Sequence, residues 1–276
     1  MLSLGEMIRK SQPALFWCMR SLSKSKREAI YTLFAFCRHL DIIARSDMPF
    51  AEKREFLSAW REELDNIYDK KVPLTNIGRK IYKNCMRFNL PKEYWLEILN
   101  SAVLKTEYSW QSPRMKEFEQ YIRGSAVIPF RLALMIIDSE HLKVGEELSK
   151  NLGMAVLLTY MLKDVKDDAK TGQLYIPTEI LQEAGVEQVT PREIIEDKNF
   201  VHVREKLAYA VENGYVKSER LLAKMNYADT RVFRLIYNLG RSQFDIMKKR
   251  GWEIISPKPK INFAKRMNIF YHTVFK

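Results

Sequence analysis

Apolar residues recur at intervals of three and four along most of this 276-residue chain. Between residues 51 and 67, for example, Phe56, Trp60 and Leu64 follow one another at that spacing, which places them on one face of a helix. Glycine is scarce, with ten residues in 276, so the chain has few of the tight turns that sheets require. The pattern therefore predicts an all-α fold.

The expected helices follow one another with short polar breaks. They span residues 25–44, 51–67, 114–137, 144–169, 200–225 and 230–250. Ser25 and Glu28 match a capping box, so the first helix is expected to begin there. Residues 173–177 follow Gly172 and are expected to be non-helical. Because no repeat, low-complexity run or linker interrupts the series, residues 1–276 are expected to form a single domain.

Composition excludes several classes of protein. The three cysteines and four histidines are scattered, without a Cys-x-x-Cys pair or zinc-ligand spacing, which disfavours a disulfide framework and structural zinc. No secretory signal is present, and no apolar run approaches the ~20 residues that span a bilayer, so a cytoplasmic protein is expected. A net charge of +12 predicts an anionic partner. No zinc finger, RNP motif or basic zipper appears, so nucleic acid is not the partner expected.

The positive charge is densest near the C-terminus. The lysines and arginines from residue 248 onward are opposed by Glu253 alone. Five aromatic residues lie among them: Trp252, Phe263, Phe270, Tyr271 and Phe275. The commoner arrangement is a terminal helix whose aromatic side chains pack inward while its lysines stay solvated. The alternative is a face that rests on an anionic membrane surface, which would make the protein peripheral on the inner face of the membrane.

An acidic pair, Asp164 and Asp168, is the strongest chemical signal. Residues four apart on a helix lie about 40° apart around its axis, so the two carboxylates project side by side. Such a pair is repulsive unless a cation lies between its members, and Mg²⁺ prefers carboxylate and phosphate oxygen. A solvated acidic helix end is the alternative, although the apolar stretch at residues 154–162 just before the pair indicates burial.

Two ordered motifs resemble the signatures of the squalene/phytoene synthase family. Residues 160–169 read Tyr-Met-Leu-Lys-Asp-Val-Lys-Asp-Asp-Ala and residues 172–177 read Gly-Gln-Leu-Tyr-Ile-Pro. The second family signature is Asn-x-x-Arg-Asp-x-x-Glu-Asp-Ala, then Gly-Arg-x-Tyr-x-Pro. Residues 35–45, Ala-Phe-Cys-Arg-His-Leu-Asp-Ile-Ile-Ala-Arg, resemble the first, Ala-Phe-Cys-Arg-x-x-Asp-Asp-x-x-Asp. Flanking stretches are similar to the bacterial presqualene diphosphate synthase branch, so the resemblance covers about residues 10 to 270.

The resemblance implies an isoprenoid synthase fold, with helices around a central apolar cavity. In this family two aspartate clusters hold Mg²⁺ on prenyl diphosphates, two of which are joined head to head. For this chain, the resemblance implies that Asp164 and Asp168 bind Mg²⁺ and that these two and Asp41 are catalytic. The residues expected to bind substrate are Arg38, Arg45, Arg123, Tyr160, Lys163 and Tyr175. NADPH is not indicated.

The first aspartate cluster departs from the family pattern. Asp41 is kept, but its neighbour is Ile42 and the third carboxylate is replaced by Arg45. A guanidinium repels Mg²⁺ and pairs well with phosphate, so Arg45 could bind a diphosphate itself, as Arg123 could from a facing helix. Alternatively, Arg45 forms a salt bridge with Asp41 or Asp164.

Two functional hypotheses follow. The first is a Mg²⁺-dependent head-to-head prenyltransferase of altered activity, acting on farnesyl or geranylgeranyl diphosphate, which the second signature favours. The second is a catalytically inactive member that acts as an assembly or scaffold factor with a protein partner. A mitochondrial respiratory complex I assembly factor carries a similar domain with eroded aspartates. The second hypothesis is favoured by Ile42 and Arg45 at the lost Asp positions, by Tyr160 and Arg123, and by the basic, aromatic C-terminus.

Overall fold

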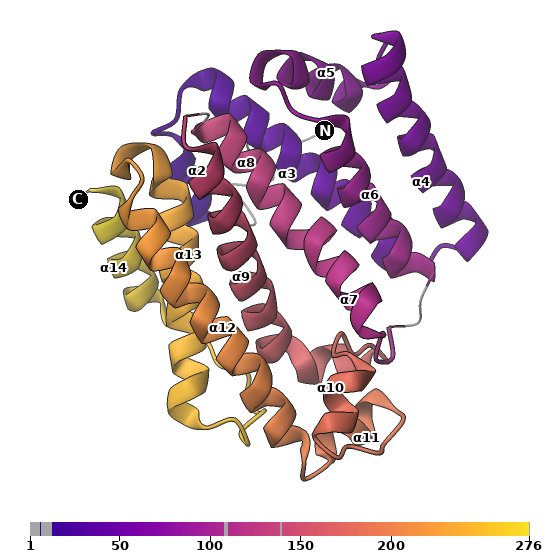
Figure 1. Cartoon of the computed structure of the whole chain (residues 1–276), viewed down its shortest axis with the longest axis vertical. Helices are drawn as coiled ribbons and strands as arrows, with labels where there is room; N and C mark the ends of the chain where they lie inside the picture. Colours follow the sequence, from indigo (N-terminus) through magenta and orange to yellow (C-terminus); the bar gives the residue numbers. More distant parts are fainter. Residues whose placement is uncertain (1–5, 7–12, 108–109, 139, 276) are drawn as a thin grey trace.

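The computed structural model describes residue 6 and residues 13–107, 110–138 and 140–275. Its elements are helices joined by short connections, which confirms the all-α prediction (Figure 1). In chain order they are α2 (Pro13–Met19), α3 (Lys24–Arg45), α4 (Phe50–Asp65), η1 (Asn66–Lys70), α5 (Asn76–Phe88), α6 (Lys92–Glu107), α7 (Met115–Ile122), η2 (Arg123–Val127), α8 (Ile128–Ile137), α9 (Leu142–Lys170), α10 (Thr178–Glu183), α11 (Pro191–Glu196), α12 (Phe200–Ala223), α13 (Tyr227–Arg250) and α14 (Phe263–Val274). The segments η1 and η2 are π-helical turns.

Helix α9 is the element around which the others pack. It runs through the middle of the molecule between α12 on one side and the α7–α8 pair on the other (Figure 1). Its buried apolar side chains follow at the expected spacing of three and four residues: Leu148, Leu152, Ala155, Leu158, Leu162, Val165 and Ala169. Apolar residues from α2 to α13 join it in one large hydrophobic cluster. This shared core fits the expectation of a single domain, whose extent over residues 1–276 stays a prediction.

Small residues let the neighbours of α9 approach closely. At Gly214 of α12, a Cβ atom would lie 2.9 Å from Ala155 Cβ and 3.0 Å from the carbonyl oxygen of Asn151. At Gly153 of α9, a Cβ would lie 3.2 Å from the backbone of Ala126 in η2. Backbone-to-backbone packing of this kind fixes α9 in position on two sides, because a packed interior has no room for small displacements.

The π-helical turn η2 also lies close to α6. A Cβ atom on Gly124 would collide with the carbonyl oxygen of Glu97 and with the side chain of Ser101. The sequence predicted one uninterrupted helix over residues 114–137, and the structure instead has α7, η2 and α8 in succession. Single π-helical turns inside helices are frequent at functional sites. Here the turn places Gly124 and Ser125 in the wall of a cavity.

The ends of two helices determine where polar residues lie. Helix α3 begins at Lys24 with Ser23 as its N-cap, so the predicted start at Ser25 was wrong by one position. Helix α9 ends where Gly172 adopts a left-handed conformation with φ of 74°, a conformation that glycine adopts without steric cost. The non-helical segment after it was predicted correctly, and it pairs with the chain after α6 through Leu174 and Gln111.

Helix α14 does not bury all of its aromatic side chains. Phe270 packs against the core, as does Trp252 just before the helix. Phe263, Tyr271 and Phe275 are exposed, so the expectation that the C-terminal aromatic residues pack inward was wrong for these three. Among the described residues, none of the helices is both long and apolar enough to cross a membrane.

The close crossing of α9 and α12 gives a first prediction. Gly214→Ala should lower the free energy of unfolding by about 1–3 kcal/mol, because the new methyl group has no room against Ala155 and Asn151. Gly145→Ala is the matched control: it lies in α9, where the nearest atom is the flexible end of Arg131 at 3.3 Å. There the higher helix propensity of alanine should raise stability by up to about 1 kcal/mol. Urea denaturation followed by circular dichroism measures both, and equal effects would contradict the packing argument.

Candidate functional site

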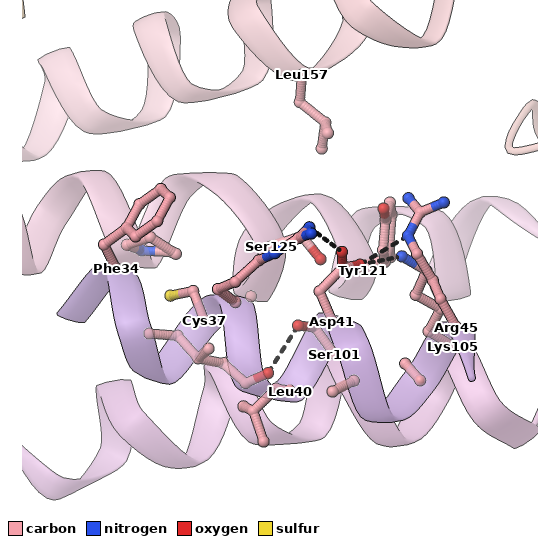
Figure 2. Close-up of a pocket in the computed structure, with 16 residues that line it drawn as sticks. Phe34, Cys37, Leu40, Asp41, Arg45, Ser101, Lys105, Tyr121, Ser125 and Leu157 are labelled. Atoms are coloured by element: carbon pink, nitrogen blue, oxygen red, sulfur yellow. Dashed lines mark hydrogen bonds and ion pairs between the residues drawn. The ribbon is translucent and has the colours of Figure 1, made fainter. Parts of the chain in front are cut away.

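A cavity of about 450 Å³ lies between α3, α6, η2, the start of α8 and α9. Figure 2 shows that its two ends differ in chemistry. Asp41, Arg45 and Lys105 gather at one end, and Phe34 and Cys37 lie at the other, while Leu157 of α9 projects from above toward the middle of the cavity. Such a cavity can hold a ligand with a charged end and an apolar end.

The charged end is organised around Asp41. Its Oδ1 atom accepts from Lys105 Nζ at 2.6 Å and from Arg45 Nε at 2.8 Å. Its Oδ2 atom lies 3.5 Å from Arg38 Nη1. Three cations therefore surround one carboxylate, and this wall of the cavity carries a net positive charge. We call Arg38, Arg45 and Lys105 the cation wall.

The members of the cation wall differ in exposure. The side chains of Arg38 and Arg45 are 55% and 50% exposed, whereas that of Lys105 is only 6% exposed. Burial lowers the pKa of Lys105, and the Asp41 carboxylate opposes that effect. Burial would raise the pKa of Asp41, but Lys105 and Arg45 outweigh it and hold the pKa below its ordinary range. Lys105 and Asp41 thus each keep the other charged, while the two arginines are free to turn toward a ligand.

Three aromatic rings support this wall from behind. Trp110, Tyr121 and Tyr175 form a small buried cluster in which the two tyrosine rings stack with centroids 5.5 Å apart. Lys105 Nζ lies 6.0 Å from the centroid of Tyr175, a cation–π arrangement. Burial raises the pKa of Tyr121 to about 12, so its hydroxyl stays protonated at neutral pH. The tyrosines therefore add no negative charge to the site.

Asp168 of α9 lies close enough to the charged end to interact electrostatically with Arg45 and Lys105, although neither it nor Asp164 is among the residues that line the cavity. Burial and the neighbouring Asp164 both raise the pKa of Asp168, while Arg45 and Lys105 oppose that shift from across the site. Asp164 Oδ2 lies 3.4 Å from Lys163 Nζ, and its Oδ1 contacts Lys258 Nζ. Within the described ranges, Asp168 forms no ion pair of its own. Its charge is the least compensated in the site.

The two aspartate clusters differ in their fitness for a divalent metal. Among the described residues, no group of three or more His, Cys, Asp or Glu side chains is arranged to hold an ion. Asp164 and Asp168 nevertheless supply two hard oxygen donors whose mutual repulsion a cation would relieve, and the buried Asp164 Oδ1 already has an ammonium, Lys258 Nζ, as its neighbour. They fit Mg²⁺, with phosphate and water oxygen completing its shell. Asp41 does not fit, because its oxygens are already engaged by three cations.

Beyond the apolar end, a second cavity of about 170 Å³ continues the first. The two share Phe34, Cys37 and Pro129 as lining residues, and the second is otherwise lined by apolar side chains such as Phe233 of α13. Burial raises the pKa of the Cys37 thiol to about 12, so this sulfur stays protonated and acts as apolar lining rather than as a nucleophile. The apolar end of the first cavity and this second cavity, which together we call the apolar chamber, can hold a hydrocarbon chain.

The structure brings some of the residues singled out from the sequence to the cavity and leaves others outside it. Asp41, Arg38 and Arg45 line the cavity, and Tyr175 stands behind Lys105. Arg45 pairs with Asp41, one of the alternatives left open by the sequence.

Tyr160 and Lys163 lie on a neighbouring face of α9, beside Asp164. Lys163 Nζ stands 4.4 Å from the ring centroid of Tyr160, which is half-exposed.

Arg123 does not reach the cavity. Its Nη2 atom donates to Glu97 Oε1 at 2.9 Å, and its Nε atom contacts Oε2 of the same carboxylate. It lines a separate groove beside Arg131 and Lys150. Its placement gives no support to a diphosphate contact from the facing helix.

Sequence analysis missed Lys105 and Tyr121. A signal for Lys105 was present, because Ile98, Ala102 and Lys105 share the three- and four-residue spacing of a buried helix face. A lysine in that position must have a partner. No comparable signal pointed to the partner, since Asp41 lies 64 residues away.

An all-α bundle around a cavity that is cationic at one end and apolar at the other defines a class of protein that can hold an amphipathic anion. Comparison with known proteins narrows the class. Residues 8–265 match the squalene/phytoene synthase family, and the chain belongs to that family.

Relatives agree with this assignment. The presqualene diphosphate synthase of Sinorhizobium fredii (strain NBRC 101917 / NGR234) is 27% identical over 260 residues, covering 93% of this chain and 91% of that protein. The phytoene synthase of Mycobacterium tuberculosis (strain ATCC 25618 / H37Rv) is 28% identical over 172 residues, covering 62% of this chain and 55% of that protein.

Solved structures support the fold. A dehydrosqualene synthase in complex with a ligand matches with a TM-score of 0.82 at 20% identity, covering 98% of this chain and 93% of that one. A squalene synthase from Alicyclobacillus acidocaldarius matches with a TM-score of 0.76 at 18% identity, covering 90% and 94%. The prediction of an isoprenoid synthase fold is confirmed.

The pairing of Asp41 with Lys105 predicts a pH-dependent contribution to stability. Asp41→Asn should lower the free energy of unfolding at pH 7 by about 1–2 kcal/mol, a value discounted because Asp41 is one-third exposed. The native pKa lies below that of the unfolded chain, near 3.9, so this stabilisation is complete above about pH 5 and is lost as the pH falls through the native pKa. The difference between wild type and variant should therefore shrink by pH 3.

Denaturation curves across that pH range measure this difference. Asp47→Asn removes an exposed carboxylate six residues further along and serves as the control, for which we expect no such pH dependence. A penalty for Asp41→Asn that stays constant from pH 7 to pH 3 would show that the ion pairs do not stabilise the fold.

Proposed function

We propose that this protein binds prenyl diphosphates in the cavity and joins two of them head to head. The hydrocarbon chain lies in the apolar chamber and the diphosphate at the charged end. One observation carries the proposal: Arg38, Arg45 and Lys105 stand at one end of a cavity whose other end is apolar, and Asp168 of α9 lies within electrostatic reach of two of them. An amphipathic anion matches this arrangement at both ends. Family membership and the names of the relatives support the same substrate class.

The cation wall would bind diphosphate directly. Arg45 and Arg38 are half-exposed, so each can keep one contact with Asp41 while its other nitrogens donate to phosphate oxygen. Asp41 would then act as a positioning residue that holds Arg45 and Lys105 in place. A guanidinium carries its charge permanently, whereas a metal must first bind. Arg45 would thus replace the metal that a carboxylate at its position would have held.

The α9 carboxylates would hold the second charged group. Asp164 and Asp168 would bind Mg²⁺, with Lys163 beside them. When bound, Mg²⁺ neutralises the charge that develops on a leaving diphosphate. The apolar lining around Leu157 and Phe34 excludes water from the reacting carbons.

The proposed reaction conserves atoms and charge. The C–O bond of one prenyl diphosphate breaks and the diphosphate leaves with the electron pair. The double bond of the second prenyl diphosphate attacks the carbon atom whose C–O bond has broken, and a C–C bond forms. A proton is then lost to the departing diphosphate. Arg38 and Arg45 would stabilise the diphosphate that remains on the product. Asp164 and Asp168 would hold the metal beside the diphosphate that leaves.

Incubation of the purified protein with Mg²⁺ and farnesyl or geranylgeranyl diphosphate tests the proposal. Released diphosphate and extracted lipid, measured by mass spectrometry, should reveal a C30 or C40 product. Asp164→Ala and Asp168→Ala should each lower the rate by about 10²-fold or more, because each removes half of the metal site. Arg45→Ala should have an effect of similar size, and Arg45→Lys should restore part of the rate.

Arg123→Ala is the matched control, because Arg123 is ion-paired with Glu97 away from the cavity. We expect little change in rate from this variant. A rate that falls with Arg123→Ala as steeply as with Arg45→Ala would contradict the assignment of the cation wall. Absence of product, together with absence of binding of either diphosphate, would exclude the enzymatic function.

An inactive scaffold is the second candidate function. One observation favours it: Asp41, Arg45 and Lys105 satisfy one another without any ligand. A closed network of this kind would persist in a protein that had lost its chemistry and kept its fold. Binding distinguishes the two, because the scaffold function predicts no saturable binding of farnesyl diphosphate by isothermal titration calorimetry. A search for protein partners would then follow.

Helix α14 supports peripheral contact with an anionic membrane. Phe263, Met267 and Tyr271 follow at four-residue spacing and are all exposed, while Lys265 and Arg266 lie beside them. Apolar side chains inserted among lipid headgroups, with basic residues at the phosphate level, are the usual arrangement of an interfacial helix. Substrates and products with long hydrocarbon chains partition into membranes, so docking there would place the cavity near its ligands.

Vesicle binding tests this contact. The protein should sediment with vesicles of phosphatidylcholine and phosphatidylglycerol, less with phosphatidylcholine alone, and less again as salt is added. A double variant, Phe263→Ser with Tyr271→Ser, should abolish most of the binding. Tyr209→Ser, at a residue of α12 that is 73% exposed, is the control and should bind like wild type. Equal binding by wild type and both variants would show that α14 is not the docking surface.

A further inference from the structure

A single lysine from the segment between α13 and α14 reaches the carboxylates of α9. Lys258 Nζ donates to Asp167 Oδ2 at 3.0 Å and contacts Asp164 Oδ1 as an ion pair. The two aspartates are three residues apart on α9, and Lys258 is 91 residues further along the chain than Asp167. This cation is therefore brought to the site by the fold.

The backbone around Lys258 is fixed on both sides. Arg250 Nη1 donates to the carbonyl oxygen of Pro257 at 2.7 Å, and Nε2 of the buried Gln243 donates to that of Pro259 at 3.1 Å. The flanking prolines restrict their own φ angles and bias Lys258 toward an extended backbone. The ammonium thus extends from a backbone that is anchored on both sides, unlike a surface lysine that meets a carboxylate by chance.

Lys258 occupies the carboxylate oxygen that a metal would need. Asp164 Oδ1 is buried and its neighbour there is Lys258 Nζ. An ammonium and a divalent cation cannot both lie in the first coordination position on one oxygen, because they repel each other and compete for the same lone pairs. The Lys258 side chain is 37% exposed, so it has room to withdraw. The exposed Asp167 would keep it within reach after it leaves Asp164.

We propose that Lys258 is a built-in counter-ion of Asp164, which a divalent cation must displace in order to bind between Asp164 and Asp168. This inference rests on the metal site of the proposed function. It adds a residue outside both aspartate signatures that sets the affinity of that site. The displaced ammonium, still tethered through Asp167, is then available to an oxygen of the incoming diphosphate, so metal and diphosphate would favour each other's binding.

Titration with Mn²⁺ alone, in the absence of substrate, tests the proposal. Electron paramagnetic resonance measures free Mn²⁺, and therefore binding, without any need for activity. Lys258→Met should bind Mn²⁺ about fivefold more tightly than wild type or better, because the competing cation is gone. Lys258→Arg keeps a cation on the arm and should bind no more tightly than wild type.

Lys260→Met is the matched control for net charge. It removes an equal charge two residues further along the same segment, from an exposed side chain, and should leave Mn²⁺ affinity close to that of wild type. Asp164→Asn should abolish the measured binding, which ties the signal to α9. Circular dichroism of each variant establishes that it is folded.

Two outcomes overturn the proposal in distinguishable ways. If wild type binds Mn²⁺ and Lys258→Met binds it equally or more weakly, Lys258 is not a competitor, and the proposed metal site stands without it. If every protein fails to bind Mn²⁺, Lys258→Met included, the metal site itself falls, together with the part of the proposed function that depends on it.

Discussion

The position of α9 is the constraint on which the rest of the structure depends. Its buried face is packed along its whole length, and the close contacts of Gly153 with η2 and of Gly214 with Ala155 leave it no room to shift. Residues 154–162 of the helix are mostly apolar, and Asp164 and Asp168 follow on its last two turns. A helix held this tightly delivers its final carboxylates to one place. The preorganisation that a charged site requires is therefore supplied by apolar packing far from the charges.

The cation wall has a different electrostatic requirement. Lys105 is almost fully buried, and a buried ammonium is stable only with a partner, which Asp41 provides. Arg45 and Arg38 then lie on the remaining lone pairs of the same carboxylate. Where the resemblance implies a carboxylate, Arg45 places a guanidinium, which repels cations and attracts anions, and Asp41 holds that charge in place.

Apolar periodicity was enough to predict the all-α fold and the long helices α9, α12 and α13 to within a few residues. The second aspartate signature puts the expected metal ligands Asp164 and Asp168 at the C-terminal end of α9, and their role stays a prediction. Features that depend on three-dimensional neighbours were not predictable. The π-helical turn η2 arises from close packing of Gly124 on α6, which the sequence records only as one glycine in a helical stretch. Arg123 was expected at the cavity, and that turn directs it to Glu97 instead. The contacts of Lys105 with Asp41 and of Lys258 with Asp164 join residues that are far apart in the chain. A single sequence considered on its own carries no signal that pairs them.

The charges on the two sides of the site are compensated differently, and this difference helps to explain how the family fold can persist when its first aspartate signature changes. The apolar chamber, the buried α9 and the aromatic cluster behind Lys105 do not depend on Arg45, so the fold tolerates its presence. The ion pairs of Asp41 satisfy the cation wall when no ligand is present, which removes the penalty of unpaired charge. On the α9 side, Lys258 does the same for Asp164, whereas Asp168 is left without an ion pair among the described residues. Burial and the neighbouring Asp164 raise the pKa of Asp168, while Arg45, Lys105 and Lys258 oppose that shift. Under the proposed function, a bound cation would relieve the repulsion that remains between Asp164 and Asp168.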